Sequence, residues 1–157
     1  MTKLKPPPKT IEELMTPNPI AISGAASASD LAVILDENEV SGLPVTDQLD
    51  RVIGVVSRTD LLHRCIEGPL GTRPEGSFLA SVAEGLGGRR GVASLGVVSE
   101  FMNPDPVIAT LDDPPSAVAA RMMEERVHRV IIVDEERHLL GILTTLDMLR
   151  VIATETP

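Results

Sequence analysis

Two short motifs place a hydroxyl and a carboxylate where a strand is expected to end and a helix to begin. They are Ser57-Arg58-Thr59-Asp60 and Thr144-Thr145-Leu146-Asp147. A helix N-terminus offers free backbone N–H groups and the positive end of the helix dipole, so a hydroxyl there helps to hold a phosphate. A carboxylate three residues later can accept hydrogen bonds from both hydroxyls of a ribose. The same spacing also forms ordinary helix caps, so each motif has a ligand-binding and a capping interpretation.

Other reactive side chains do not form an expected catalytic or metal site. His63 and Cys65 are two residues apart and would face different sides of a helix, which argues against a thiol dyad. No His, Cys and Asp cluster has metal-ligand spacing, so a Mg²⁺ ion would enter only with a nucleotide. With a single cysteine and no secretory segment after Met1, the expected location is the cytoplasm.

Charge and composition argue against several classes of protein. The 157 residues are 43% hydrophobic and carry a net charge of −9, and all three lysines lie within the first nine residues. The remaining acidic body would repel nucleic acids and anionic lipid headgroups. The chain has two phenylalanines and no tryptophan or tyrosine, so stacking on single-stranded bases is not expected. No window approaches the roughly 20 apolar residues of a membrane span.

An internal repeat supplies the elements that position the two motifs. Residues 11–62 align with residues 98–149 without a gap at an offset of 87, and the identities fall on turn-forming residues such as Gly54/Gly141 and Asp60/Asp147. We expect one body made of two interdependent halves. The predicted parts are a flexible tail (1–9), repeat 1 (10–64), a Gly-rich insert (65–97), repeat 2 (98–153) and a C-terminal tail (154–157).

Each repeat predicts the order β-α-β-β-α, which is an α+β arrangement with a mixed sheet covered by helices on one face. In repeat 1 we expect, after a capped helical turn at Ile11–Met15, strand Ile20–Ile22, a helix opened by Ser27 and Asp30, strands Leu43–Thr46 and Val52–Val56, and helix Thr59–Cys65. In repeat 2 we expect strand Val107–Thr110, helix Ser116–Arg126, strands Val130–Val133 and Leu139–Leu143, and helix Leu146–Ile152. Within the long helix of repeat 2, Val118, Met122 and Met123 have core spacing.

The two copies are expected to pack sheet to sheet. The apolar spacing within Ser77–Leu86 is compatible with a short helix in the insert. The glycines of the insert favour a mobile connector over a phosphate cradle, because no Gly-Lys-Ser/Thr sequence accompanies them.

Three paired motifs resemble those of the cystathionine-β-synthase (CBS) domain family. They are Met-Thr-Pro-Asn-Pro-Ile with Met-Asn-Pro-Asp-Pro-Val, Val-Ser-Gly-Leu-Pro-Val-Thr-Asp with Val-His-Arg-Val-Ile-Ile-Val-Asp, and Gly-Val-Val-Ser-Arg-Thr-Asp-Leu-Leu with Gly-Ile-Leu-Thr-Thr-Leu-Asp-Met-Leu. The resemblance covers about two thirds of the chain and is greatest to small stand-alone pairs. It implies a Bateman module, in which two copies bind adenosine-containing ligands in clefts between them and regulate a partner.

The resemblance also assigns candidate site residues. Asp60 and Asp147 would hold ribose, with Ser57 and Thr144 on the adjoining phosphate or sugar. Site 1 would combine Ser57, Arg58, Asp60, Val107, Ile108, His128 and Arg129. Site 2 would combine Thr144, Asp147, Ile20, Ala21, Ser41, Gly42, Leu43 and Pro44. The strand residues also have a core-packing interpretation, and adenine would be held by aliphatic side chains and backbone.

The two sites differ in charge. The His128-Arg129 pair sits where the family's nucleotide-sensing kinase subunit carries a phosphate-binding His-Arg pair, and Arg58 belongs to the same predicted cleft. Guanidinium groups suit phosphate, so site 1 should prefer phosphorylated adenosines. An ion pair with the acidic helix end at Glu124 and Glu125 is the alternative for Arg129. Site 2 has no cation in its motifs and suits a weakly charged adenosyl ligand or none.

We therefore expect a non-enzymatic sensor of AMP, ADP or ATP that regulates a partner protein, with S-adenosylmethionine as a further candidate ligand. A homodimer is expected, because the fold suits symmetric association. No nucleic-acid polymer, membrane or metal partner is expected. The alternative is a ligand-free interaction or dimerisation module, and a third hypothesis is an enzyme using Cys65.

Overall fold

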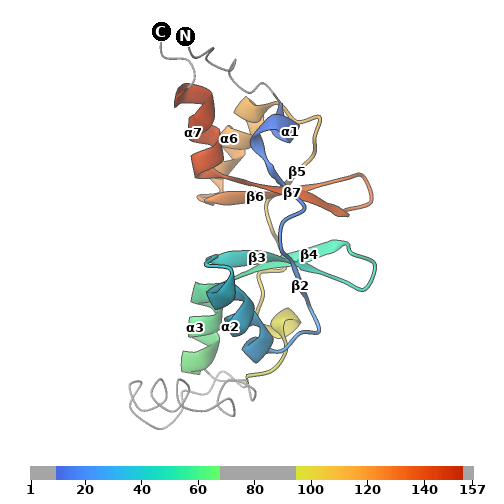
Figure 1. The fold of residues 1–157 in the computed structure, drawn as a ribbon, viewed down its shortest axis with the longest axis vertical. Helices are drawn as coiled ribbons and strands as arrows, with labels where there is room; N and C mark the ends of the chain where they lie inside the picture. The colour runs from blue at the N-terminus through green and yellow to red at the C-terminus, as the bar shows by residue number, and fades with distance from the viewer. Residues whose placement is uncertain (1–9, 68–94, 154–157) are drawn as a thin grey trace. The chain divides into compact units, whose positions relative to one another are not determined.

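The computed structural model describes residues 10–67 and 95–153, which form two compact units (Figure 1). Unit 1 contains the described residues of 10–19, 49–52 and 106–153, and unit 2 those of 20–48 and 53–105. Each unit therefore combines the sheet and helices of one repeat with the N-terminal segment of the other. Helix α1 (Ile11–Leu14) belongs to unit 1, and the 3-10 helix η1 (Val98–Glu100) belongs to unit 2.

Unit 2 has a three-stranded sheet with helices on one face (Figure 1). Its order is β2 (Ile22–Ser23), β3 (Gly42–Thr46), β4 (Val52–Ser57), and β2 runs parallel to β3. The helices are α2 (Ala28–Glu37) and α3 (Arg58–Glu67). Apolar residues at helical spacing on α2 meet alternate residues of the strands, as the two periodicities require. The resulting core contains Leu31, Leu35, Leu43, Val45 and Val56.

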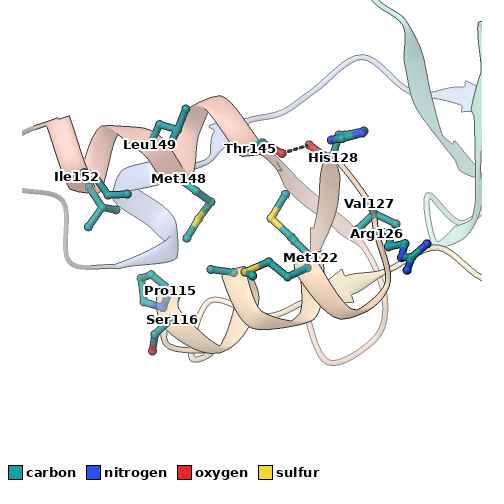
Figure 2. Close-up of a pocket in the computed structure, with 13 residues that line it drawn as sticks. Pro115, Ser116, Met122, Arg126, Val127, His128, Thr145, Met148, Leu149 and Ile152 are labelled. Atoms are coloured by element: carbon teal, nitrogen blue, oxygen red, sulfur yellow. Dashed lines mark hydrogen bonds between the residues drawn. The ribbon is translucent and has the colours of Figure 1, made fainter.

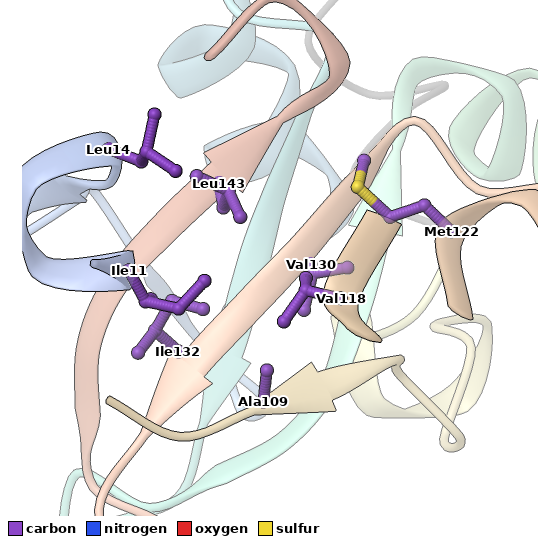
Figure 3. Close-up of a cluster of buried hydrophobic side chains, with 8 residues drawn as sticks. All are labelled: Ile11, Leu14, Ala109, Val118, Met122, Val130, Ile132 and Leu143. Carbon is purple, nitrogen blue, oxygen red and sulfur yellow. The ribbon is translucent and has the colours of Figure 1, made fainter. Parts of the chain in front are cut away.

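Unit 1 has a four-stranded sheet in the order β1 (Thr16–Pro17), β7 (Leu139–Thr144), β6 (Arg129–Val133), β5 (Ile108–Ala109). Strand β7 is antiparallel to both neighbours, and β5 is parallel to β6. Helices α6 (Pro115–Glu124), α7 (Thr145–Ala153) and α1 lie on one face (Figure 1). The core shown in Figure 3 consists of Ile11, Leu14, Ala109, Val118, Met122, Val130, Ile132 and Leu143.

The predicted helix boundaries have identifiable caps. Thr10 with Glu13 and Ser27 with Asp30 form the two expected capping boxes of α1 and α2. At the other end, the residues just beyond α2 and α6 adopt the same left-handed conformation, with φ of 53° at Glu39 and 55° at Arg126. These residues are 87 positions apart, so the repeat preserves the helix ends as well as the strands.

The N-terminal segment of each repeat packs on the last strand of the other repeat's sheet. Thr16 pairs with Ile142 in unit 1, and Asn103 pairs with Val55 in unit 2. Each contact passes over a glycine: a Cβ added at Gly54 would lie 2.6 Å from the sulfur of Met102, and one at Gly141 would meet the sulfur of Met15. The repeat therefore preserves a methionine and a glycine that lie in close contact with each other in each unit.

Several predicted boundaries differ from the structure. Strand pairing starts at Ile22, so Ile20 and Ala21 precede β2. Strand β5 ends at Ala109, because the N–H of Thr110 donates to Asp113 at 2.8 Å and no longer continues the ladder.

The expectation that Met123 lies in the core is wrong. Its side chain is 80% exposed, while Met122, one turn after Val118, is buried. Met123 lies five positions after Val118, which places it on another side of the helix.

The predicted helix Ser77–Leu86 lies outside the described residues. No helix in residues 10–67 and 95–153 is long and apolar enough to cross a membrane.

Candidate functional site

The first motif joins the end of β4 to the start of α3 by hydrogen bonds within the motif. The backbone N–H and the hydroxyl of Ser57 both donate to Oδ2 of Asp60, at 2.7 and 2.8 Å. The N–H of Asp60 donates back to the hydroxyl of Ser57 at 3.2 Å. The carboxylate is thereby fixed at the first turn of α3, where it complements the helix dipole.

The second motif reproduces this arrangement at the junction of β7 and α7. The N–H and hydroxyl of Thr144 donate to Oδ2 of Asp147, both at 2.8 Å, and the N–H of Asp147 donates to the hydroxyl of Thr144 at 3.3 Å. The atoms and the pattern are the same as at Ser57 and Asp60. The sequence repeat is therefore a repeat of local geometry.

In each unit the start of the helix is also bonded to the residue just before the neighbouring strand, which is β3 in unit 2 and β6 in unit 1. The N–H of Arg58 donates to the carbonyl of Ser41 at 2.9 Å, and the N–H of Thr145 donates to the carbonyl of His128 at 3.0 Å. The hydroxyl of Thr145 adds a bond to the same carbonyl at 3.3 Å (Figure 2). The structure thus brings Ser57, Arg58 and Asp60 beside Ser41 in unit 2, and Thr144 and Asp147 beside His128 in unit 1.

Both interpretations of these aspartates are compatible with their geometry. Within the described residues, the caps that Asp60 and Asp147 form with Ser57 and Thr144 use Oδ2, and Oδ1 takes no part in them. A carboxylate can therefore cap its helix with one oxygen and accept a ligand hydroxyl with the other. The Ser27/Asp30 pair has a similar box and no assigned ligand role, so the box alone does not define a site.

The three side chains predicted to contact phosphate at site 1 have different surroundings. The guanidinium of Arg58 donates to the carbonyl of Leu35 near the end of α2 at 3.0 Å. One such bond leaves other N–H donors of an exposed arginine available to an anion. The side chain of His128 is exposed, and Arg129 is half-buried in the first position of β6.

The predicted strand residues divide into core and accessible positions. Leu43 is 2% exposed and belongs to the core of unit 2, so its side chain packs in the interior. Ile20 is 46% exposed, and Ala21 is half-buried. Gly42 and Pro44 are buried in β3, whereas Ile108, the first residue of β5, and Val107 just before it are half-buried. Pairing of each aspartate with residues of the other repeat stays a prediction.

A polar cluster behind β5 was not singled out from the sequence. Arg121 on α6 donates a short hydrogen bond to the carbonyl of Ile108, and its guanidinium is 4.0 Å from Asp113. Asp113 in turn accepts the N–H of Thr110. The signal that could have revealed it is a difference between the repeats, because the positions equivalent to Asp113 and Arg121 are Ala26 and Ile34.

An apolar pocket of about 650 Å³ between α6 and α7 was also not predicted (Figure 2). Met122 and Met148 line its interior, Leu149 and Ile152 lie towards one end, and His128 lies towards the other. Leu149 and Ile152 are 50% and 65% exposed. This surface is a candidate for apolar contacts.

The remaining reactive groups do not assemble a reactive centre among the described residues. Burial raises the pKa of the Cys65 thiol, so the nucleophilic thiolate is disfavoured, and His63 is exposed. In the described ranges, no three His, Cys, Asp or Glu side chains are placed to hold a metal ion.

Comparisons with known proteins agree with the doubled geometry. The CBS domain model matches residues 11–67 and 98–154. The chain is 30% identical over 139 residues to 5'-AMP-activated protein kinase subunit gamma-3 of Bos taurus, covering 81% of this chain and 25% of that subunit. The chain thus spans about a quarter of the length of that curated relative.

Among solved structures, CBSX2 of Arabidopsis thaliana has a TM-score of 0.72 and 26% identity, covering 92% of this chain and 94% of that one. A structure of CBSX2 in complex with AMP has a TM-score of 0.70 and 26% identity, with coverage of 93% and 97%. With two family matches that together cover more than half of its residues, the chain belongs to the CBS domain family.

Proposed function

We propose that the chain is a non-enzymatic regulatory module that binds an adenosine-containing ligand of the AMP, ADP or ATP class and modulates a partner protein. The observation that carries the proposal is the doubled arrangement of Ser57 with Asp60 and Thr144 with Asp147. Both pairs lie at a strand-to-helix junction that is bonded to the residue just before the neighbouring strand, β3 or β6. The AMP complex of CBSX2 and the similarity to a subunit of AMP-activated protein kinase support the ligand class.

The chemistry of the junction suits a nucleoside. Oδ1 of each aspartate is positioned on a carboxylate whose other oxygen is already held, so binding a ribose hydroxyl does not require the carboxylate to be ordered first. The hydroxyl of Ser57 or Thr144 already donates to its aspartate, so a phosphate or sugar oxygen at the junction would take over that hydrogen bond. The positive end of the helix dipole favours a phosphate there. Adenine would lie against aliphatic side chains, since no aromatic residue belongs to the motifs.

The proposed sites differ in the charge they offer. Site 1 contains Arg58, His128 and Arg129, and guanidinium groups bind phosphate oxygens well. Site 2 contains Ser41 and Gly42 and takes a weakly charged adenosyl ligand such as S-adenosylmethionine, or none. We therefore propose that AMP, ADP and ATP bind preferentially at site 1.

Calorimetric titration tests this function. AMP, ATP and S-adenosylmethionine are each titrated into the full chain at about 100 μM, which detects dissociation constants into the high micromolar range. GMP serves as the control for base recognition. Saturable heat with at least one adenosine compound, and weaker or no heat with GMP, is expected. The absence of saturable heat with all three adenosine compounds would overturn the proposal.

A second candidate function is a ligand-free dimerisation module, favoured by the exposed apolar residues beside the α6/α7 pocket. Met123, Leu146, Leu149 and Ile152 are each at least half exposed, and such clustered apolar surface marks interaction sites. Sedimentation equilibrium of the chain and of a Leu149→Lys/Ile152→Lys variant tests this. A dimer that the variant converts to a monomer supports the module, and a wild-type monomer contradicts it.

Thermal denaturation separates the two candidates. A ligand that binds the native state raises the melting temperature, whereas a ligand-free scaffold gains nothing from added nucleotide. The two functions are compatible if both results are positive.

A further inference from the structure

Strand β5 is held by a charged side chain that has no counterpart in repeat 1. Arg121 on α6 donates to the carbonyl of Ile108, and its guanidinium is 4.0 Å from Asp113. Asp113 Oδ2 accepts the N–H of Thr110 at 2.8 Å and its hydroxyl at 3.5 Å. The cluster of Thr110, Asp113 and Arg121, here termed the β5 tether, therefore connects both ends of the strand to α6.

Strand β5 depends on this tether because it is short and lies at the edge of its sheet. The strand has two residues and lies at the edge of its sheet, with β6 as its partner. The N–H of Ile131 donates to the carbonyl of Val107, so in this parallel pairing the carbonyl of Ile108 points away from β6. Short edge pairing is weak by itself. Arg121 satisfies the outward carbonyl and attaches the strand to a helix of the core.

In repeat 1 the positions equivalent to Asp113 and Arg121 of the β5 tether are apolar. Positions equivalent to Thr110, Asp113 and Arg121 are Ser23, Ala26 and Ile34. Ala26 and Ile34 pack against the core of unit 2. The aspartate and the arginine are thus both replaced by apolar residues, as expected of two residues that act together, because either charge alone would lack its partner.

We infer that the β5 tether is a positioning network for the proposed nucleotide site that contains Ile108 of β5 and Val107, which directly precedes it. This inference rests on the proposed function and deepens it. A strand held before the ligand arrives does not have to be ordered on binding, which improves affinity. The site that includes β5 should therefore depend on Asp113 and Arg121, whereas the site that includes Ile20 and Ala21 lacks their counterparts.

The repeat itself supplies the test variant. Asp113→Ala/Arg121→Ile introduces the residues of repeat 1 into repeat 2 without leaving an unpaired charge. We expect its AMP dissociation constant to rise about tenfold, from loss of a charge-assisted hydrogen bond that orders the strand. Arg121→Lys keeps a donor on a flexible chain and should recover part of the affinity. The matched control is Arg64→Met, because Arg64 also donates to a backbone carbonyl, that of Leu95, at 2.8 Å.

Hydrogen exchange gives a readout that does not depend on nucleotide. The amide of Ala109, within the β5–β6 pairing, should exchange about tenfold faster in the double variant than in the wild type and in Arg64→Met. If the wild type binds AMP and the double variant binds within twofold of it, the inference is overturned while the proposed function stands. Equal losses of affinity in the double variant and Arg64→Met would overturn it too, as a general effect of stability.

Wild-type protein that binds no adenosine compound would overturn the proposed function and the binding part of this inference together. Hydrogen exchange at Ala109 would then test only whether the β5 tether holds the strand in place. Unchanged exchange in the double variant would show that it does not.

Discussion

Replacing Asp60 separates the two interpretations of the Ser-x-x-Asp motif, because unit 2 contains an internal control. Asp60 and Asp30 each accept the N–H of a serine three residues earlier, at 2.7 and 3.2 Å. Both lie in the first turn of a ten-residue helix. Asp60→Ala and Asp30→Ala therefore remove comparable caps, and only the first removes a proposed ribose ligand.

The expected magnitudes differ between stability and binding. Loss of a helix cap costs about 1 kcal/mol, which lowers the melting temperature by about 2–4 °C in a chain of this size. Each charge-assisted hydrogen bond to ribose is worth about 1.5–3 kcal/mol, so Asp60→Ala should also weaken binding at its site at least about tenfold. Asp30→Ala should leave the AMP dissociation constant within about twofold of the wild-type value.

Urea denaturation measures the first effect, and calorimetric titration with AMP measures the second. Both variants should unfold at lower urea concentration with an unchanged slope, which keeps the comparison within one two-state transition. If Asp60→Ala and Asp30→Ala lose stability and bind AMP equally well, Asp60 is a cap alone. The ligand-binding interpretation of the motif would then be wrong.

Three further predictions concern packing, reactivity and pH. Gly54→Ala should destabilise the chain by about 1–3 kcal/mol, because its Cβ would lie 2.7 Å from the backbone oxygen of Asn103; denaturation at wild-type urea concentration would contradict this close approach. Burial raises the pKa of the Cys65 thiol, so reaction with Ellman's reagent at pH 7 should be slower than in urea-unfolded chain, and equal rates would refute the assignment. Desolvation opposes ionisation of Asp134, but hydrogen bonds from the His138 and Glu136 N–H groups and the His138 imidazole lower its pKa below the ordinary 3.8. This contribution is present above pH 3.8 and is lost as the pH falls through the lowered value. Asp134→Asn should therefore lose less stability than wild type between pH 5 and pH 3, and parallel curves would contradict it.

The elements of both repeats were predictable because their signals are local. Capping boxes at Thr10 and Ser27 mark helix starts, and apolar periodicity marks α2 and the strands of both sheets. The motif positions followed from the repeat, since the same strand-to-helix junction recurs 87 residues later. The caps and the periodicity need information from only a few neighbouring residues, and the repeat is found by aligning the sequence with itself.

The rest depends on contacts between distant segments. Strand β1 forms only because Thr16 and Pro17 pair with β7, more than 120 residues away. The motif predicts Arg58 as a phosphate ligand, and in the structure its guanidinium also donates a hydrogen bond to the carbonyl of Leu35. Arg121 looks like a solvated helix residue until α6 is placed behind β5. Pairings of this kind are set by tertiary packing, which the sequence pattern of one segment does not specify.

A crystal structure of the chain grown with AMP would show directly whether the two aspartates bind ribose. We expect AMP with its ribose hydroxyls within 3.2 Å of Oδ1 of Asp60 or Asp147, a hydrogen-bonding distance, while Oδ2 keeps its bonds to Ser57 or Thr144. AMP bound elsewhere on the chain, or both aspartates without ligand at saturating AMP, would show that neither aspartate is a ribose ligand.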